Sequence, residues 1–258
     1  MLDSLYIGAT GMHAQQTSID VIANNLANVN TAGFKRNRID FEDLLYRNIS
    51  AASVTQTAMG NGSAGLGTAI MATGKIFIEG DLKKTDQPLD VAIKGQGFYE
   101  LTRPDGSSVY TRSGTFQVNA DGLLVNQDGF PIAGSLQVPP DTKSVQIQAD
   151  GRVFVVTRAD PRPVVIGQIE LSNFVNAAGL EPLGDNLYVA TSRSGDALRS
   201  VPGENGSGTL AQGFQEASNV KLIDEMVNLV IAQRAYEINA KVVQASDEML
   251  SIANGLFR

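Results

Sequence analysis

Apolar residues recur at helical spacing near the start of the chain. From Ser4 to about Asn28 the apolar positions are separated alternately by four and by three residues. The polar residue Gln16 occupies one position of this pattern and is its sole interruption. Asp3 or Ser4 can cap the start of a helix there, and Gly33, which tolerates a positive φ, can end it. These positions predict an N-terminal helix with one apolar face, called here the N-terminal stripe: Leu5, Ala9, Met12, Ile19, Ala23 and Leu26.

The same spacing returns at the end of the chain, from Ser218 to about Asn254, with Ser218 or Asn219 as a cap and Gly255 as a stop. At 1.5 Å per residue, the N- and C-terminal helices would be roughly 40 Å and 55 Å long. Two such helices, each with an apolar face, are expected to pair with one another in a coiled-coil-like arrangement. The face of the second helix, the C-terminal stripe, consists of Leu222, Met226, Leu229, Gln233, Tyr236, Ala240, Val243, Asp247 and Leu250.

Gly8 and Gly11 lie inside the predicted N-terminal helix, where each costs roughly 1 kcal/mol relative to alanine. Two interpretations stay open. The first turn of the helix is frayed, or the small residues let a second helix approach closely.

Between the two helices, residues 90–200 have the pattern of β-structure. Asp-Gly pairs punctuate the short apolar runs and are typical of hairpin turns, because both residues tolerate positive φ. The fold class predicted is therefore α+β, with paired terminal helices and an antiparallel β-rich middle domain built as a sandwich or barrel. The runs are Val91–Ile93, Gly97–Leu101, Thr115–Val118, Val153–Thr157 and Val164–Phe174, and the Asp-Gly pairs are at 105–106, 121–122, 128–129 and 150–151.

Composition excludes several classes of function. The chain has 258 residues, a net charge of −7 and a pI near 4.8, so it lacks the basic surface that displaces counterions from nucleic acid. It contains no cysteine, which excludes disulfides and thiolate chemistry. No run approaches the roughly 20 apolar residues of a membrane span. No secretory leader is expected, because the first lysine is Lys35.

No catalytic, cofactor-binding or metal-binding residue is predicted, and no small-molecule substrate. The stretch GNGSAG at residues 60–65 matches G-x-G-x-x-G, but the residues around it do not predict the strand and helix that a dinucleotide site needs. His13 is the sole histidine and has no cysteine to join it at a metal. The acidic pairs Glu42/Asp43 and Asp247/Glu248 are sequence neighbours, which do not face each other on a helix.

The N-terminal helix is nearly uncharged, with Asp20 as the sole formal charge between Ser4 and Asn30. Its second face carries amides, among them Asn24, Asn25 and Asn28, which can satisfy one another in a buried contact without the desolvation cost of ions. We therefore expect one side of this helix to meet the C-terminal helix and the other to meet copies of the chain. The alternative is an ordinary helix within one globular core.

Three stretches resemble the bacterial flagellar rod and hook family of axial proteins: LANVNTAGFK (26–35), DVAIKGQGF (90–98) and SNVKLIDEMVNLVIAQRAYEINAKVV (218–243). The first stretch includes Gly33 and Phe34, which the resemblance adds to the expected assembly residues. The segment FEDLLY (41–46) and the Gly/Ser/Ala-rich residues after it are most similar to the distal-rod members. Residues 48–74 carry no charge, and we hypothesise that they stiffen the rod shaft that such proteins form.

The resemblance implies three regions. Residues 1–34 and 218–258 would form an inner helical domain, residues 35–89 and 201–217 an extended connector, and residues 90–200 an outer β-rich domain. It also implies export by the flagellar type III apparatus without leader cleavage, and helical assembly into a rigid rod through the periplasm. The implied partners are copies of the chain, other rod proteins, the hook protein, and the L and P ring proteins.

Alternatives are another rod or hook subunit of this family, or a β-rich binding module oligomerised by terminal coiled coils. The lack of tryptophan counts against the binding module, which would need an aromatic platform. Burial of the two stripes could contribute about 10–15 kcal/mol, which is less than the cost of ordering both ends of the chain. We therefore expect the ends to be disordered until copies assemble.

Overall fold

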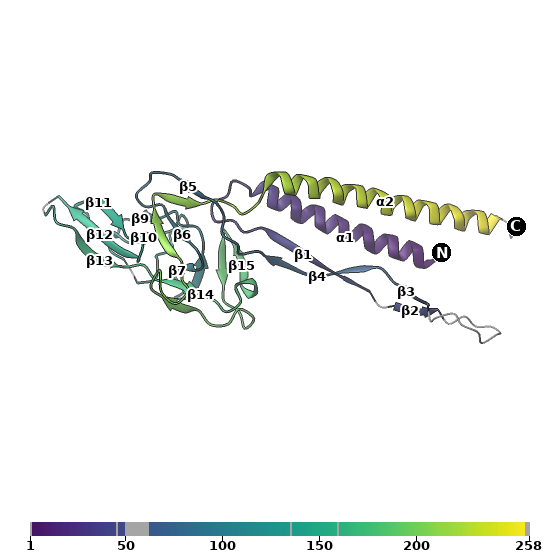
Figure 1. The fold of residues 1–258 in the computed structure, drawn as a ribbon, viewed down its shortest axis with the longest axis horizontal. Helices are drawn as coiled ribbons and strands as arrows, with labels where there is room; N and C mark the ends of the chain where they lie inside the picture. The colour runs from purple at the N-terminus through teal and green to yellow at the C-terminus, as the bar shows by residue number, and fades with distance from the viewer. Residues whose placement is uncertain (1, 45, 50–61, 135, 159, 256–258) are drawn as a thin grey trace. The chain divides into compact units, whose positions relative to one another are not determined.

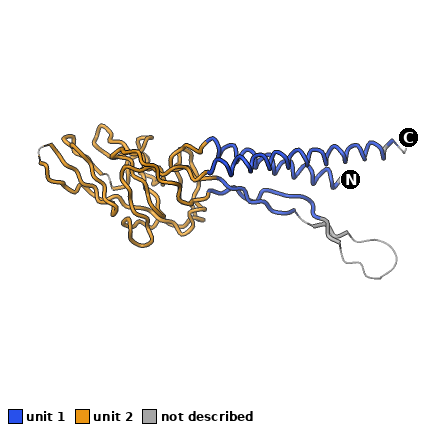
Figure 2. Tube along the Cα trace, turned by 45° about the horizontal axis from the view of Figure 1, so that its top comes forward, with its two compact units in different colours: residues 1–27, 37–75, 221–258 blue, residues 28–36, 76–220 orange. Residues whose placement is uncertain are grey.

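The computed structural model describes residues 2–44, 46–49, 62–134, 136–158 and 160–255, and divides them between two compact units. Unit 1 comprises the two ends of the chain and residues 37–75, and unit 2 comprises residues 28–36 and 76–220 (Figure 2). The prediction of an α+β chain with a helix at each end and an antiparallel β-rich middle is confirmed.

Unit 1 contains two long helices and two paired strand segments. The helices are α1 (Leu2–Ala27) and α2 (Leu222–Gly255), which lie side by side (Figure 1). Strands β1 (Asn37–Asp43) and β4 (Thr68–Lys75) pair antiparallel with a bulge between Asp40 and Phe41. The shorter strands β2 (Tyr46–Ile49) and β3 (Gly62–Gly65) pair beyond them.

The helix boundaries differ from the predicted ones at the start of α2. Asn219 does not cap this helix, because its side chain accepts a hydrogen bond from Arg36 N (2.7 Å) and donates one to Ile76 O (2.8 Å). Ser218 instead accepts from Val220 N (3.3 Å), and the helix begins at Leu222. Asn219 thus binds two other segments of unit 2, and Ser218 binds within its own segment.

Residues 50–61, within the segment that we expected to stiffen the shaft, lie outside the described residues. Gly62–Gly65 of the GNGSAG stretch form β3, and the next element is β4. A strand therefore follows these glycines where a dinucleotide site needs a helix N-terminus.

Unit 2 is built from short antiparallel strands. Its elements are β5 (Leu82–Lys84), β6 (Val91–Lys94), β7 (Phe98–Thr102), β8 (Ser108–Thr111), β9 (Gln117–Val118), β10 (Leu124–Val125), β11 (Thr142–Ile147), β12 (Arg152–Thr157), β13 (Val164–Gln168), β14 (Leu171–Asn173), the 3₁₀ helix η1 (Ala177–Gly179), β15 (Glu181–Gly184), β16 (Leu187–Val189), β17 (Leu198–Ser200), β18 (Thr209–Gln212) and β19 (Phe214–Glu216).

A six-stranded sheet, in the order β15-β16-β8-β7-β14-β17, organises this unit beside the three-stranded sheet β11-β12-β13. Strand β6 pairs with β18, and β5 pairs with β19. The buried side chains of these strands form two apolar clusters, a larger one and a smaller one around Phe98, Tyr110, Leu180 and Tyr188, because alternate residues of a strand point to opposite faces of a sheet. The fully buried members of the larger cluster include Val91, Ile93, Tyr99, Leu101, Val109, Val153, Ile169 and Leu171.

The Asp-Gly pairs mark turns, as predicted. Turns 105–106, 121–122 and 150–151 join the antiparallel pairs β7–β8, β9–β10 and β11–β12. The glycine of each pair has a positive φ, whereas the aspartates do not. The aspartates contribute by their side chains instead: Asp105 Oδ1 accepts from Ser107 N (2.8 Å) and Asp150 Oδ1 accepts from Arg152 N (3.1 Å).

Candidate assembly surfaces

Helices α1 and α2 contact each other along a seam of small and polar residues. Ser4 Oγ lies 3.4 Å from Ser246 Oγ, and Asn25 Nδ2 donates to Glu225 Oε2 at 3.5 Å. The first residues of α1 therefore contact the last turns of α2, and the end of α1 contacts the start of α2, so the two helices are antiparallel. The contacts place Ser4, Gly8, Gly11 and Asn25 of α1 and Glu225, Asn239, Val243 and Ser246 of α2 on this seam. Steps of three and four residues extend it through Gln15, Ser18 and Ile22 of α1 and through Ala232 of α2.

Gly8 and Gly11 allow the two backbones to approach closely. A Cβ placed on Gly8 would lie 2.7 Å from Val243 Cγ2, and a Cβ on Gly11 would lie 2.8 Å from Asn239 Nδ2. Both glycines lie within the continuous helix α1. Of the two interpretations left open by the sequence, the structure favours close helix–helix approach over a frayed turn.

The predicted pairing of the two helices is confirmed, and Val243 of the C-terminal stripe lies on the seam beside Gly8. The N-terminal stripe, however, is offset from the seam. Each residue of the N-terminal stripe follows a seam position by one residue, or about 100° around the helix. Ala9 and Ala23 are exposed, and Leu5, Met12, Ile19 and Leu26 are partly buried. Of the C-terminal stripe, Leu229, Val243 and Leu250 are partly buried, whereas Leu222, Met226 and Tyr236 are exposed. Whether these residues serve assembly stays a prediction.

The outward surface of α2 is strongly apolar. A soluble monomer rarely exposes a large contiguous apolar patch, so a surface of this kind is typical of an interaction site. The exposed large apolar side chains of this helix are Leu222, Ile223, Met226, Val227, Val230, Ile231, Tyr236, Ile238, Val242, Met249 and Ile252.

The amides of α1 hold the β1–β4 hairpin within unit 1. Buried Asn25 accepts from Asn37 N (2.8 Å) through Oδ1 and donates to Asn37 O (3.0 Å) through Nδ2. Asn24 Oδ1 accepts from the side chain of Asn37 (3.2 Å). Asn28, which belongs to unit 2, accepts from Thr31 Oγ1 (3.1 Å). Asn25 is therefore satisfied within its own chain, a role that sequence reasoning did not assign to it.

Gly33 and Phe34 are buried in unit 2. Gly33 has φ +68°, and a Cβ there would lie 2.8 Å from Ser113 N, so the position requires glycine. Its N–H donates to Glu216 O (2.8 Å), and Phe34 O accepts from Asn219 N (3.4 Å). These bonds fix the segment after α1 against the segment before α2 within this unit.

A buried ion cluster of Lys35, Glu216 and Arg112 completes this junction of segments. Glu216 Oε1 accepts from Lys35 Nζ (2.6 Å) and Gly80 N (3.0 Å), and Oε2 accepts from Arg112 Nε (2.9 Å). Lys35 Nζ also donates to Ile78 O (2.7 Å). The Lys35 and Glu216 side chains are 0% and 1% exposed, so their charges must be paired in place.

The environment shifts the pKa values of this cluster. Burial lowers the pKa of Lys35, the charge of Glu216 opposes this, and Arg112 adds to the lowering. For Glu216 burial acts to raise the pKa, but the charges of Arg112 and Lys35 outweigh it, so the pKa lies below its usual value. Sequence reasoning missed this cluster, because its three members are far apart in the chain.

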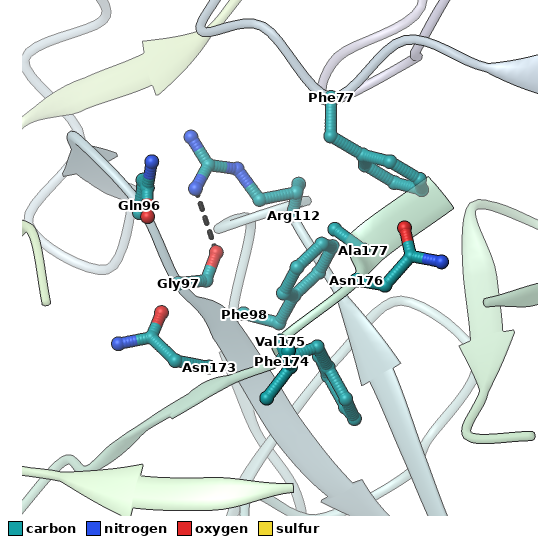
Figure 3. Close-up of a pocket in the computed structure, with 10 residues that line it drawn as sticks. All are labelled: Phe77, Gln96, Gly97, Phe98, Arg112, Asn173, Phe174, Val175, Asn176 and Ala177. Atoms are coloured by element: carbon teal, nitrogen blue, oxygen red, sulfur yellow. Dashed lines mark hydrogen bonds between the residues drawn. The ribbon is translucent and has the colours of Figure 1, made fainter. Parts of the chain in front are cut away.

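A cavity of about 270 Å³ lies beside this cluster in unit 2 (Figure 3). Phe77, Phe98 and Phe174 line it, with the rings in edge-to-face contact at centroid distances of 5.3 Å and 5.7 Å. Arg112 lines it too, but its Nη1 donates to Gly95 O (2.9 Å) and Gly97 O (2.6 Å). The charged group at this cavity is thus engaged in holding the backbone.

Neither described helix combines the length and the apolar character that crossing a bilayer requires. Among the residues that the structure describes, no group of three or more His, Cys, Asp or Glu side chains is arranged to hold a metal ion.

Three family models match separate parts of the chain. The model "Flagella basal body rod protein" matches residues 5–35, which include most of α1 and the Gly33–Lys35 segment. "Flagellar hook protein FlgE/F/G D1 domain" matches residues 92–155, in unit 2. "Flagellar basal body rod FlgEFG protein C-terminal" matches residues 211–256, which include α2.

Relatives align with nearly the whole chain. The flagellar basal-body rod protein FlgG of Buchnera aphidicola subsp. Acyrthosiphon pisum (strain APS) is 46% identical over 254 residues, which cover 97% of this chain and 98% of the relative. The protein of the same name from Borreliella burgdorferi is 44% identical over 265 residues and the full length of both chains. That from Caulobacter vibrioides is 41% identical over 260 residues and 99% of both chains.

Proposed function

The chain belongs to the flagellar basal-body rod protein family as a structural subunit of the distal rod, and we propose that it assembles helically with its own copies into a rigid driveshaft. This shaft passes motor torque to the hook. The identity of more than 40% over nearly the full length supports the rod assignment over the alternative of a binding module.

The observation that carries the assembly proposal is the apolar surface of α2. Ile223, Ile231, Ile238 and Ile252 are each at least 60% exposed, although a soluble helix normally turns such residues inward. The seam buries mainly small and polar residues, and these isoleucine side chains stay uncovered. Copies of the chain are the occupants that a rod supplies at every position along its length.

We assign the assembly role to the residues singled out in the sequence, and the two helices pack as a coiled coil along their seam. Gly33 and Phe34 act by fixing the segment that follows α1. The residues are Leu5, Ala9, Met12, Ile19, Ala23, Asn24, Asn25, Leu26, Asn28, Gly33, Phe34, Leu222, Met226, Leu229, Tyr236, Val243 and Leu250.

In this proposal, residues 1–34 and 218–258 form the inner wall of the rod, and residues 90–200 form its outer domain. Residues 35–89 and 201–217 connect the inner wall to the outer domain. The neighbours are other rod proteins, the hook protein and the L and P rings. The subunit is exported without a cleaved leader to the periplasm-spanning rod. Its function lies in packing, without enzymatic activity.

Electron microscopy of the purified, concentrated protein tests this proposal. We expect helical tubes for the wild type, and no tubes for Leu229→Asp, because burying a carboxylate at this partly buried helix position costs free energy of desolvation. Gln244→Asp, on an exposed position of the same helix, is the matched control and should still form tubes.

Discrete oligomers of the wild type would instead favour a binding module oligomerised by its helices. Leu26→Asp should behave as Leu229→Asp does, while the thermal midpoint of unit 2 stays unchanged in both. Motility that survives both substitutions would contradict the assigned assembly surface.

A further inference from the structure

Helix α2 carries a second heptad stripe that the sequence analysis did not single out. It starts at Ile231 and continues in alternating steps of four and three residues without a polar interruption. Ile231, Ile238, Val242 and Ala245 each precede a seam position of α2 by one residue. We call it the outer stripe: Ile231, Ala235, Ile238, Val242, Ala245, Met249 and Ile252.

The outer stripe makes a better helix-packing surface than the seam that α1 already occupies. Its members are all aliphatic or methionine, whereas the seam of α2 combines Val243 with the polar residues Glu225, Asn239 and Ser246. Yet six of its seven members are exposed, and Ala235 is partly buried. The strongest apolar face of α2 is therefore turned away from the helix beside it.

The N-terminal stripe of α1 matches this surface in spacing and in length. It runs from Leu5 to Leu26, and the outer stripe runs from Ile231 to Ile252, so that each extends over three seven-residue repeats. Gln16 is the sole polar residue on the α1 side. Both surfaces belong to the same chain, so every copy offers one of each.

The two stripes lie on opposite sides of the helix pair. In an antiparallel pair, positions one residue after the seam on both helices share a side, and positions one residue before it share the other side. The N-terminal stripe follows its seam and the outer stripe precedes its own. They therefore cannot meet within one copy and can meet only between copies.

We propose that the outer stripe of one copy packs against the N-terminal stripe of a second copy, as a heterologous contact. Such a contact repeats without closing when the copies are related by a screw rotation, so it builds an open filament. This proposal rests on the proposed function and names the two surfaces that contact each other between copies. The second copy is the occupant, because the stripes match each other in period, length and apolar character.

Disulfide cross-linking tests the proposal cleanly, since the chain contains no native cysteine. One protein set carries a single cysteine on the N-terminal stripe (Leu5→Cys, Met12→Cys, Ile19→Cys), and the other carries one on the outer stripe (Ile231→Cys, Ile238→Cys, Ile252→Cys). Each pair is mixed, polymerised and oxidised. We expect a disulfide-linked dimer from at least one register of pairs, and none from mixtures with Gln244→Cys, which lies off the outer stripe.

The double variant Ser4→Cys/Ser246→Cys reports the seam and should link within one chain in the same tubes. Separately, Ile238→Asp should raise the critical concentration for tube formation at least tenfold, whereas Gln244→Asp should not. Tubes that form without any cross-link between the two stripes would overturn this inference and leave the proposed function standing. A wild-type chain that never forms tubes would overturn the proposed function itself.

Discussion

Removal of the Glu216 carboxylate perturbs the buried ion cluster most directly. Glu216→Ala takes away the acceptor of four hydrogen bonds: from Lys35 Nζ (2.6 Å), Arg112 Nε (2.9 Å), Arg112 Nη2 (3.2 Å) and Gly80 N (3.0 Å). It leaves two cations in a site where Lys35 is fully buried and Arg112 is nearly so. Breaking a buried ion pair by removing one partner costs about 3–5 kcal/mol.

That cost corresponds to a lower thermal midpoint for unit 2 by about 6–20 °C, because a unit of this size loses about 2–4 °C per kcal/mol. Scanning calorimetry at neutral pH measures the shift. Glu181→Ala is the matched control, because Glu181 is exposed on β15. A midpoint that stays unchanged, or that falls equally in the control, would refute the reasoning that the cluster holds this unit together.

The pH dependence of the same variant provides a second check. The pKa of Glu216 in the folded chain lies below its value in the unfolded chain. Between these two pKa values the folded state therefore binds fewer protons than the unfolded state. Its contribution is present in full above the unfolded pKa, usually about 4.5, and is lost as the pH falls through the folded pKa. The difference in midpoint between wild type and Glu216→Ala should therefore shrink in acid, and a difference that grows there would contradict the assignment.

Three further substitutions test separate features. Gly8→Leu should raise the critical concentration for tubes about tenfold or more, because overpacking against Val243 costs about 1–3 kcal/mol, and Val243→Ala should partly restore it. Gly11→Ala should be tolerated, since the contacting Asn239 amide is the free end of a side chain; an effect equal to that of Gly8→Leu would argue against the seam geometry. Gly33→Ala should destabilise unit 2 by about 1–3 kcal/mol, because alanine is strained at its φ of +68°, and an unchanged calorimetric midpoint would show that this turn relaxes.

The sequence predicted the elements of the fold well, since their signals are local. Asp-Gly pairs located the β7–β8 and β11–β12 turns, and the period of the apolar residues located both helices. The phase of the helix pairing could not be predicted in this way. Counting apolar positions selects the most hydrophobic face of each helix. These helices instead meet through residues such as Gly8, Gly11 and Ser246, and aliphatic residues such as Ile238 stay exposed.

The ion cluster was beyond sequence reasoning for a different cause. Lys35 lies 181 positions from Glu216, and Arg112 lies 104 positions from it. A single lysine after an apolar residue ordinarily indicates a solvated surface position. Only the packing of three distant segments within unit 2 shows that this lysine is buried.

Hydrogen exchange of the dilute subunit and of assembled tubes shows whether neighbouring copies stabilise the two helices. We expect α1 and α2 to gain their stability from these copies, since their shared seam buries mostly small and polar side chains. Amides of both helices should therefore exchange rapidly in the subunit and slowly in tubes, while amides of β7 and β12 are protected in both. Helix amides equally protected in the dilute subunit would contradict this expectation.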